Sequence, residues 1–156
     1  PDIFPVTITN DAPNNFPIGK TTVTWVALDQ NGNKSTATQD VTITYVFGEF
    51  GPPLSDGGKY RANRTLPVKF QLFYSDSSPV VDAKVGMSIY RTGEDETLSE
   101  SIDLSTIEDA DTGTYFRYEN GQYIYNLSTK GFLPGKYRIE AILSNGQSPF
   151  IDVVLK

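Results

Sequence analysis

The chain has 156 residues, a length that allows one large β domain or two small ones but excludes a large multidomain enzyme. Its 13 basic and 19 acidic side chains leave a formal net charge of −6, which disfavours nucleic acid and anionic membrane surfaces as partners. It has no histidine and no cysteine, so Ser-His-Asp and Cys-His catalysis, histidine-ligated metal sites and disulfide bonds are excluded.

The composition favours strands over helices, because Thr, Ser, Val, Tyr, Phe, Gly and Pro are abundant while helix formers are sparse. The sequence therefore predicts an all-β protein. No apolar run approaches the roughly 20 residues that a membrane-spanning helix needs, so we expect no direct membrane insertion. The chain starts at Pro1 without a signal sequence, and we expect any targeting or anchoring segment to lie outside it.

Three segments near the N-terminus alternate apolar and hydroxyl side chains with the period of two that is typical of strands. They are residues 4–10 (FPVTITN), 20–29 (KTTVTWVALD) and 36–47 (TATQDVTITYVF). The second and third should form a hairpin, because the run DQNGNKS between them is rich in turn formers. Three strands cannot bury a face and pair both edges, so we expect residues 1–47 to be an incomplete immunoglobulin-like segment that is unstable alone.

The Gly/Pro-rich run GEFGPPLSDGGKY has no periodicity, and we expect a linker over residues 48–59. Beyond it, six strand signals alternate with turn signals, which predicts an immunoglobulin-like β-sandwich over about residues 60–156. The strand signals are TLPVKFQLFYS, AKVGMSIYRT, TGTYFRYEN, GQYIYNLST, GKYRIEAIL and FIDVVLK.

Residues 10–45 (NDAPNNFPIGKTTVTWVALDQNGNKSTATQDVTITY) contain a Phe-Pro-x-Gly turn, a Thr-Val-Thr-aromatic strand, an Asp-x-x-Gly-Asn loop and a last strand. This pattern resembles the second half of a hyalin-repeat (HYR) domain. The strands that would precede that half in a complete domain are absent from this chain. The residues that carry the match are Phe16, Pro17, Gly19, Thr22, Val23, Trp25, Asp29, Gly32 and Asn33.

From Tyr45 onward the chain resembles the PxKF-type module of secreted bacterial and archaeal proteins, whose tetrapeptide reads Pro67-Val68-Lys69-Phe70 here. Residues 116–146 are similar to the closing half of that module. Both resemblances imply an extracellular or cell-surface location, a non-enzymatic spacing, cohesion or adhesion role, and neighbouring modules or surface proteins as partners. Neither implies a catalytic residue.

Two loops carry oxygen ligands of the kind that calcium prefers. Asp29, Asn31 and Asn33 alternate as in an EF-hand loop, but the sixth position is Lys34 instead of glycine, which favours an ordinary hairpin turn at Asn31-Gly32. A denser carboxylate cluster holds Glu108, Asp109 and Asp111 and is a second candidate calcium site, although an acidic surface loop between strands is the commoner explanation. We expect no other cofactor.

Lys69, Glu140 and Asp152 lie on the strands where some bacterial surface modules form a lysine-to-carboxyl isopeptide bond. Strand parity argues against this bond. Val68 and Phe70 should face inward, which leaves Lys69 on the solvated face, whereas the reaction needs a buried lysine.

Three N-x-Ser/Thr sequons occur, at Asn33, Asn63 and Asn126, and each is a candidate N-glycosylation site near a predicted turn or strand end. Such triplets also arise by chance in a chain rich in Asn, Ser and Thr. They support an extracellular origin only weakly.

Aromatic side chains gather on the predicted hairpin closed by Asn120 and Gly121. They are Tyr115, Phe116, Tyr118, Tyr123 and Tyr125. An aromatic strip can bind carbohydrate or a protein partner, so Tyr115, Tyr118, Tyr123 and Tyr125 form a candidate binding surface. The competing interpretation is that these rings stabilise the sheet as cross-strand pairs, with alternate rings in the core.

Three function hypotheses follow. The first is a non-catalytic extracellular structural or adhesion module, a spacer or cohesion fragment of a larger protein. The second is a carbohydrate- or protein-binding module that uses the aromatic hairpin 115–125. The third is a strand-sharing subunit of a filament or surface layer, for which Val26 and Leu28, on the strand face opposite Trp25, leave a partner surface. An enzyme that uses carboxylates alone remains formally open, but no pair stands out.

Overall fold

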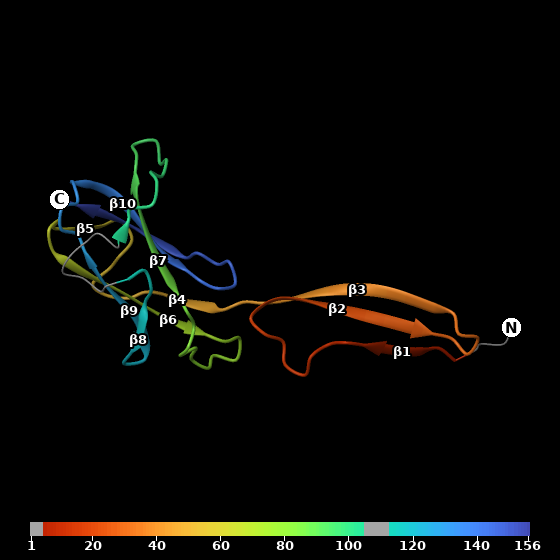
Figure 1. Cartoon of the computed structure of the whole chain (residues 1–156). Helices are drawn as coiled ribbons and strands as arrows, with labels where there is room; N and C mark the ends of the chain where they lie inside the picture. The colour runs from red at the N-terminus through yellow and green to blue at the C-terminus, as the bar shows by residue number, and fades with distance from the viewer. Residues whose placement is uncertain (1–4, 105–112) are drawn as a thin grey trace. The chain divides into compact units, whose positions relative to one another are not determined.

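The computed structural model describes residues 5–104 and 113–156, and within these ranges it contains no α-helix (Figure 1). Eleven strands in these ranges form one three-stranded and two four-stranded sheets. The all-β prediction is confirmed. The chain divides into two compact units, Pro1–Thr44 and Tyr45–Lys156, which we describe separately.

The first unit is an antiparallel sheet of order β1-β2-β3, made of β1 (Thr7–Asn10), β2 (Gly19–Leu28) and β3 (Lys34–Ile43). The predicted hairpin is confirmed, since β2 and β3 pair over their full length from Gly19↔Ile43 to Leu28↔Lys34. Alternating Thr and apolar residues suit such strands because their β-branched side chains fit a pleated surface.

This first unit buries very little apolar surface. Among its described apolar residues only Val23 is in the core, at 2% exposure, while Ile8 and Trp25 are 64% and 37% exposed. Val6 and Leu28 are exposed as well. A sheet needs a second layer against one face to gain stability from burial, and the described part of this unit contains a single layer.

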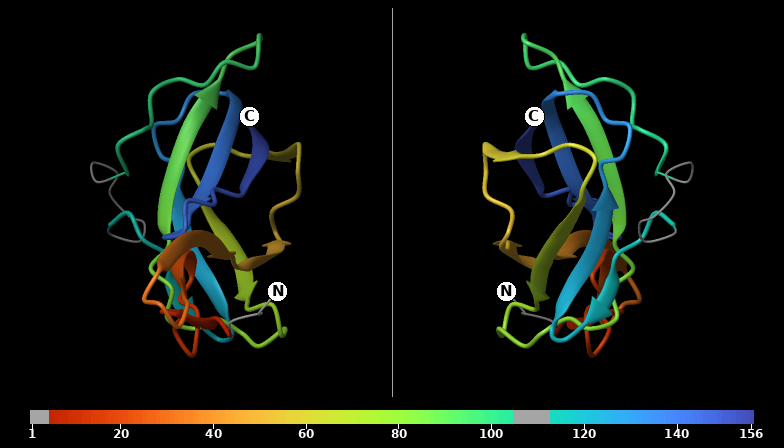
Figure 2. Two further views of the ribbon diagram at one scale, coloured as in Figure 1. Left: turned by 90° about the vertical axis from the view of Figure 1, so that its right-hand side faces the viewer. Right: turned by 90° about the vertical axis from the view of Figure 1, so that its left-hand side faces the viewer.

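The second unit is the predicted immunoglobulin-like β-sandwich. One sheet has the order β4-β6-β9-β8 and the other β5-β11-β10-β7, and Figure 2 shows them as two layers. Their strands are β4 (Val46–Phe50), β5 (Gly58–Tyr60), β6 (Thr65–Phe73), β7 (Gly86–Thr92), β8 (Arg117–Glu119), β9 (Gln122–Ser128), β10 (Gly135–Ile142) and β11 (Phe150–Leu155).

Alternate residues of the long strands fill the space between the sheets, as the period of two requires. The buried side chains on β6, β9, β10 and β11 include Val68, Phe70, Leu72, Tyr123, Tyr125, Leu127, Tyr137, Ile139, Ala141, Ile151, Val153 and Leu155. The rings add directional contacts. Phe70 stacks on Tyr123 with 5.3 Å between ring centroids and meets the edge of Phe116 at 4.8 Å.

The expected linker over residues 48–59 is wrong. Within it lie the end of β4 and the start of β5, and both strands belong to the sandwich. β4 pairs with β6 through Val46↔Phe73 and Phe47↔Leu72, while β5 runs parallel to β11. The predicted strand 36–47 is accordingly two strands, β3 and β4, which fall in different units. Packing decides this, because the Phe47 ring lies 4.9 Å from the buried Phe70 ring.

Candidate functional site

Strand parity brings a group of polar and aromatic side chains together on the outer face of the β5-β11-β10-β7 sheet. Because Tyr137, Ile139 and Ile151 face the core, their neighbours Arg138, Glu140, Phe150 and Asp152 face outward. The register of β10 with β11 places Arg138 opposite Asp152 and Glu140 opposite Phe150. With Asp56, whose side chain bonds to β11, we call these residues the Arg138 cluster.

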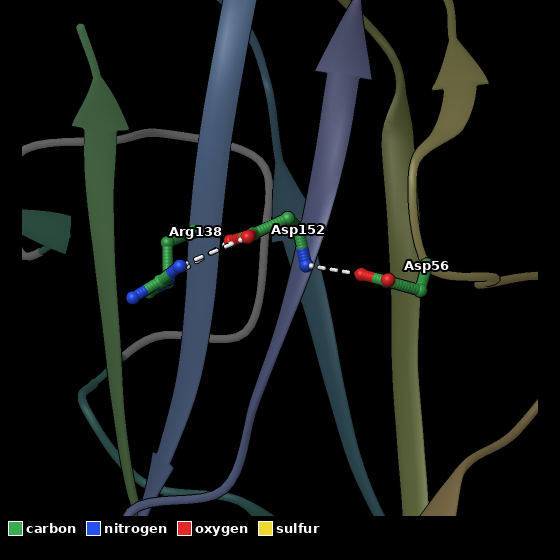
Figure 3. A network of polar contacts seen from close by, with 3 residues as sticks. All are labelled: Asp56, Arg138 and Asp152. Atoms are coloured by element: carbon green, nitrogen blue, oxygen red, sulfur yellow. Dashed lines mark hydrogen bonds and ion pairs between the residues drawn. The ribbon is translucent and has the colours of Figure 1, made fainter. Parts of the chain in front are cut away.

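The centre of the cluster is a bidentate ion pair between Arg138 and Asp152 (Figure 3). Arg138 donates from Nε to Asp152 Oδ1 and from Nη2 to Asp152 Oδ2, both at 2.9 Å. The Asp152 amide in turn donates to Asp56 Oδ1 at 3.2 Å, which ties the segment before β5 to β11. The hydrogen bond to Asp152 raises the pKa of Arg138, so the guanidinium stays charged at any physiological pH.

Two further side chains complete the cluster. The Arg138 guanidinium lies 3.8 Å from the centroid of the Phe150 ring, a cation–π geometry, and that ring is half exposed. Desolvation by burial raises the pKa of Glu140, and the nearby Asp152 raises it further, against a lowering by Arg138. The cluster thus combines a cation paired with a carboxylate, an aromatic ring and one carboxyl group whose pKa is raised. Such a surface is suited to polar recognition.

Next to the cluster is a pocket of about 250 Å³ that is lined by Asp56, Arg138 and Asp152 together with Thr92 and Lys136. The Thr92 hydroxyl is buried and has no hydrogen-bond partner in the part of the chain that the structure describes. A buried hydroxyl without a partner carries a desolvation cost, so a polar group from a ligand or a water molecule would stabilise it.

The three isopeptide candidates are not brought together. Lys69 lies on the outer side of β6 between the buried Val68 and Phe70, in one sheet, whereas Glu140 and Asp152 lie on the outer side of the other sheet. Asp152 is already engaged by Arg138. The whole thickness of the core separates the lysine from both carboxyl groups, which agrees with the parity argument against this bond.

The loop at Asp29 is a hairpin turn held by its own side chain. Asp29 Oδ1 accepts from the amides of Asn31 at 2.9 Å and Asn33 at 2.8 Å, and Oδ2 accepts from Asn33 Nδ2 at 2.7 Å. These bonds, with the Asn33 side chain first, lower the pKa of Asp29. Gly32 has φ +85°, the left-handed conformation that glycine adopts without strain. Both carboxylate oxygens thus accept hydrogen bonds within the turn.

The other candidate calcium ligands, Glu108, Asp109 and Asp111, lie outside the described residues. Within residues 5–104 and 113–156, no three carboxylate side chains come together in a way that could hold a metal ion. Calcium binding by the acidic loop stays a prediction.

The proposed aromatic binding surface needs a correction. Tyr123 and Tyr125 are each 1% exposed and belong to the core. The Tyr123 hydroxyl donates to the Val80 carbonyl and accepts from the Ala83 amide, and the Tyr125 hydroxyl donates to the Gly113 carbonyl. β9 lies between β6 and β8, so its inward residues fill the sandwich. Only Tyr115 and Tyr118 of the four reach solvent, and the Lys84 ammonium lies over the Tyr115 ring at 4.1 Å.

The sequons differ in their surroundings. Asn33 and Asn63 are exposed, and Asn63 Oδ1 accepts from the Gly131 amide at 3.0 Å. Asn126 is half buried in the middle of β9, opposite Pro67. A glycan is sterically easier to accept at a loop than within a paired strand, so Asn33 and Asn63 remain the better candidates.

Sequence reasoning missed the contacts of Arg138 with Asp152 and Phe150. A signal was present, because the SNGQS turn predicts a hairpin of the last two strands, and pairing across it places a cation beside a carboxylate. The register of that hairpin had to be known before the pair could be found.

Comparison with known families finds a match within the first unit. The model of the HYR domain, a family of extracellular adhesion-type modules, matches residues 2–43. No curated protein matches the chain. In the described residues no helix is long and apolar enough to cross a membrane.

Proposed function

We propose that the chain is a non-catalytic extracellular module, a spacer or cohesion fragment of a larger cell-surface or secreted protein. The observation that carries this proposal is the HYR match over residues 2–43 on a segment that forms a three-stranded sheet. The β-sandwich of residues 45–156, which resembles a PxKF-type module, is a compact unit of the kind that such proteins string together.

The exposed apolar side chains of the first unit suggest that this unit has a partner. Ile8 and Trp25 are exposed on one face of its sheet and Leu28 on the other, and exposed apolar side chains of this kind gain stability when another β layer covers them. We propose that this layer comes from other strands of the parent protein or from a neighbouring surface protein, so that residues 1–44 are a junction between modules.

Hydrogen exchange by mass spectrometry on the monomeric chain tests the junction. We expect the amides of β2 and β3 to exchange much faster than those of β6, β9 and β10, because little apolar burial opposes opening of the first sheet. Equal, strong protection of both units in the monomer would contradict the proposal that the first sheet needs a partner.

A bead assay tests cohesion directly. Beads coated with the chain should cluster with each other or bind a surface coated with longer segments of the parent protein, and beads coated with an unrelated β-sandwich should not. Hydrolytic or transferase activity in the purified chain would overturn the proposal, since it assigns no catalytic role.

A second candidate function, strand sharing between subunits, is favoured by one observation. β3 is a strand of ten residues that pairs only with β2 among the described residues, which leaves a long edge available to another strand. Protection of β3 against hydrogen exchange that rises with protein concentration, together with a larger species in sedimentation, would favour this assembly. Concentration-independent exchange would count against it.

A further inference from the structure

A second pocket lies at one side of the sandwich, where β4 of one sheet comes near the start of β11 of the other. Its volume is about 640 Å³, within the range of pockets that hold small ligands. The apolar part of its wall comes from Phe47, Phe50, Leu54 and Phe150. All of these residues belong to the second unit, so the pocket is a property of the sandwich alone.

The aromatic wall is held in place by the core. The Phe47 and Phe50 rings meet edge to face with 5.0 Å between their centroids. Both also pack against Phe70, a residue that is fully buried, at 4.9 Å and 5.9 Å. A wall fixed by core packing loses little freedom when a ligand arrives, so binding costs little ordering entropy.

The polar part of the wall is negative. Glu49 and Asp56 both line the pocket, and no lysine or arginine among the described residues does. Arg138 stacks on the Phe150 ring, but its charge is balanced by the ion pair with Asp152. Asp56 uses Oδ1 to accept from the Asp152 amide, which leaves its other oxygen for a ligand.

The backbone at Glu49 is unusual in its conformation and in its strand pairing. Glu49 has φ +50°, a left-handed conformation that costs a non-glycine residue about 1–2 kcal/mol, and the pairing of β4 with β6 shifts register between Phe47 and Phe50. A bulge of this kind redirects a side chain, and here the residue that it redirects is the carboxylate of the pocket wall.

We propose that this pocket binds an organic cation, an ammonium group carried on an apolar or aromatic body. The rings receive the apolar body and attract the cation through their faces, and Glu49 and Asp56 supply the opposite charge. A pocket of similar volume elsewhere in the sandwich offers a contrast, because its described wall combines Glu94 with Arg91 and Lys136 and contains no aromatic ring. This proposal does not rest on the proposed function.

Titration of the ¹⁵N-labelled full chain with three probes of similar size, each with one benzene ring, tests the proposal. The probes are benzylammonium, benzyl alcohol and benzoate, which are positive, neutral and negative. We expect benzylammonium to shift the amide signals of Glu49, Phe50, Ser55 and Phe150 with a dissociation constant on the order of 1–10 mM, since a ligand of few atoms binds weakly. Benzyl alcohol should bind several times more weakly, and benzoate should cause no shifts there.

Variants then test whether the charge of the pocket, and not its shape alone, determines which probe binds. In a chain with Glu49→Gln and Asp56→Asn, the preference for benzylammonium over benzyl alcohol should fall to about one, because each lost ion pair contributes roughly a two- to fivefold factor. The Asp56→Asn change keeps a side-chain oxygen that can accept from the Asp152 amide, so folding should be retained, and unchanged signals from β6 and β9 would verify this. Glu94→Gln is the matched control and should leave the preference unchanged.

Three results would overturn the proposal. The first is the absence of shifts at the pocket amides with benzylammonium, and the second is equal binding of benzylammonium and benzyl alcohol. The third is a preference for the cation that survives in the double variant, because the carboxylates would then not be its cause.

Discussion

Glu140, a carboxyl group of the Arg138 cluster, is partly buried, and this burial makes its contribution to stability depend on pH. Burial raises the pKa of this carboxyl group above its ordinary value of 4.5. The fold therefore favours the neutral form, and the stabilisation from Glu140 is present at acid pH and is lost as the pH rises through the raised pKa.

From this we expect Glu140→Gln to be more stable than the natural chain at pH 7, by less than about 1 kcal/mol, because the amide stays neutral. The advantage should vanish below pH 4.5, where the carboxyl group is protonated in both states. Urea unfolding followed by circular dichroism at the two pH values measures the difference. The exposed Glu100→Gln is the control, and an equal gain in that variant would contradict the role of burial.

Tyr123 is a core residue whose titration reports on burial. Desolvation raises its pKa to about 12, and its hydroxyl both donates to Val80 and accepts from Ala83. The neutral phenol is favoured in the folded state, so its contribution to stability is complete below the ordinary pKa of 10 and is lost as the pH rises through about 12.

We expect Tyr123→Phe to lower the free energy of unfolding by about 1–2 kcal/mol at neutral pH, because the buried Val80 carbonyl loses its donor and the part-buried Ala83 amide loses its acceptor. The variant should also lose a phenol that ionises near pH 12 in an ultraviolet absorbance titration. Tyr118→Phe, on the neighbouring strand and partly exposed, serves as the control. A normal phenol titration at Tyr123 would show that the ring is not buried.

At the scale of an element, the β2–β3 hairpin depends on the carboxylate of its turn. Hydrogen bonds from Asn33 and Asn31 lower the pKa of Asp29 below 3.8. A lowered pKa means that the stabilisation exists above the ordinary value of 3.8 and is lost as the pH falls through the lower, folded-state value.

We therefore expect Asp29→Asn to speed hydrogen exchange at the β2–β3 turn at neutral pH, because the neutral amide is a weaker acceptor than the carboxylate. The natural hairpin should approach the exchange behaviour of the variant at strongly acid pH, after correction for intrinsic rates. Calcium should not change the exchange of either chain, and calcium-dependent protection at this loop would contradict the turn assignment.

The end of β3 and the start of β4 cannot be located from the alternating pattern. The alternating pattern of residues 36–47 continues across the junction of two strands, so the pattern alone predicts one strand where the structure has β3 and β4. Phe47 and Phe50 join the sandwich because their rings pack on Phe70. Alternation marks which residues can lie in a strand, but long-range packing decides where the strand ends and which sheet it joins.

The molecule as a whole contains two units of very different burial, and each has its own spectroscopic reporter. Trp25 is the only tryptophan and lies in the first unit, whereas eight of the described strands lie in the second. Fluorescence of Trp25 thus follows the first sheet, and circular dichroism follows mainly the sandwich.

We expect the Trp25 signal to change at a lower denaturant concentration than the main circular dichroism transition. Ile139→Ala should shift only the second transition, by about 2–5 kcal/mol, because this side chain is fully buried between the two sheets of the sandwich. A single coincident transition in both signals, moved as one by Ile139→Ala, would show that the units unfold together.

The sequence by itself determined the all-β class, the first hairpin, the turn at Asp29 and the immunoglobulin-like sandwich, because these depend on the period of two and on local turn chemistry. It also excluded the catalytic systems that need histidine or cysteine. Parity sufficed to place Lys69 away from Glu140 and Asp152, because that argument needs only the inward and outward alternation of single strands.

Only the tertiary structure decided the rest. Whether Tyr123 is a surface ring or a core ring depends on which strands flank β9, and whether residues 48–59 form a linker depends on the aromatic rings that β4 meets. The Arg138–Asp152 pair and the negative aromatic pocket need the register and the approach of two sheets. Residues far apart in the chain create these features, and a local pattern contains no information about which distant strand will become a neighbour.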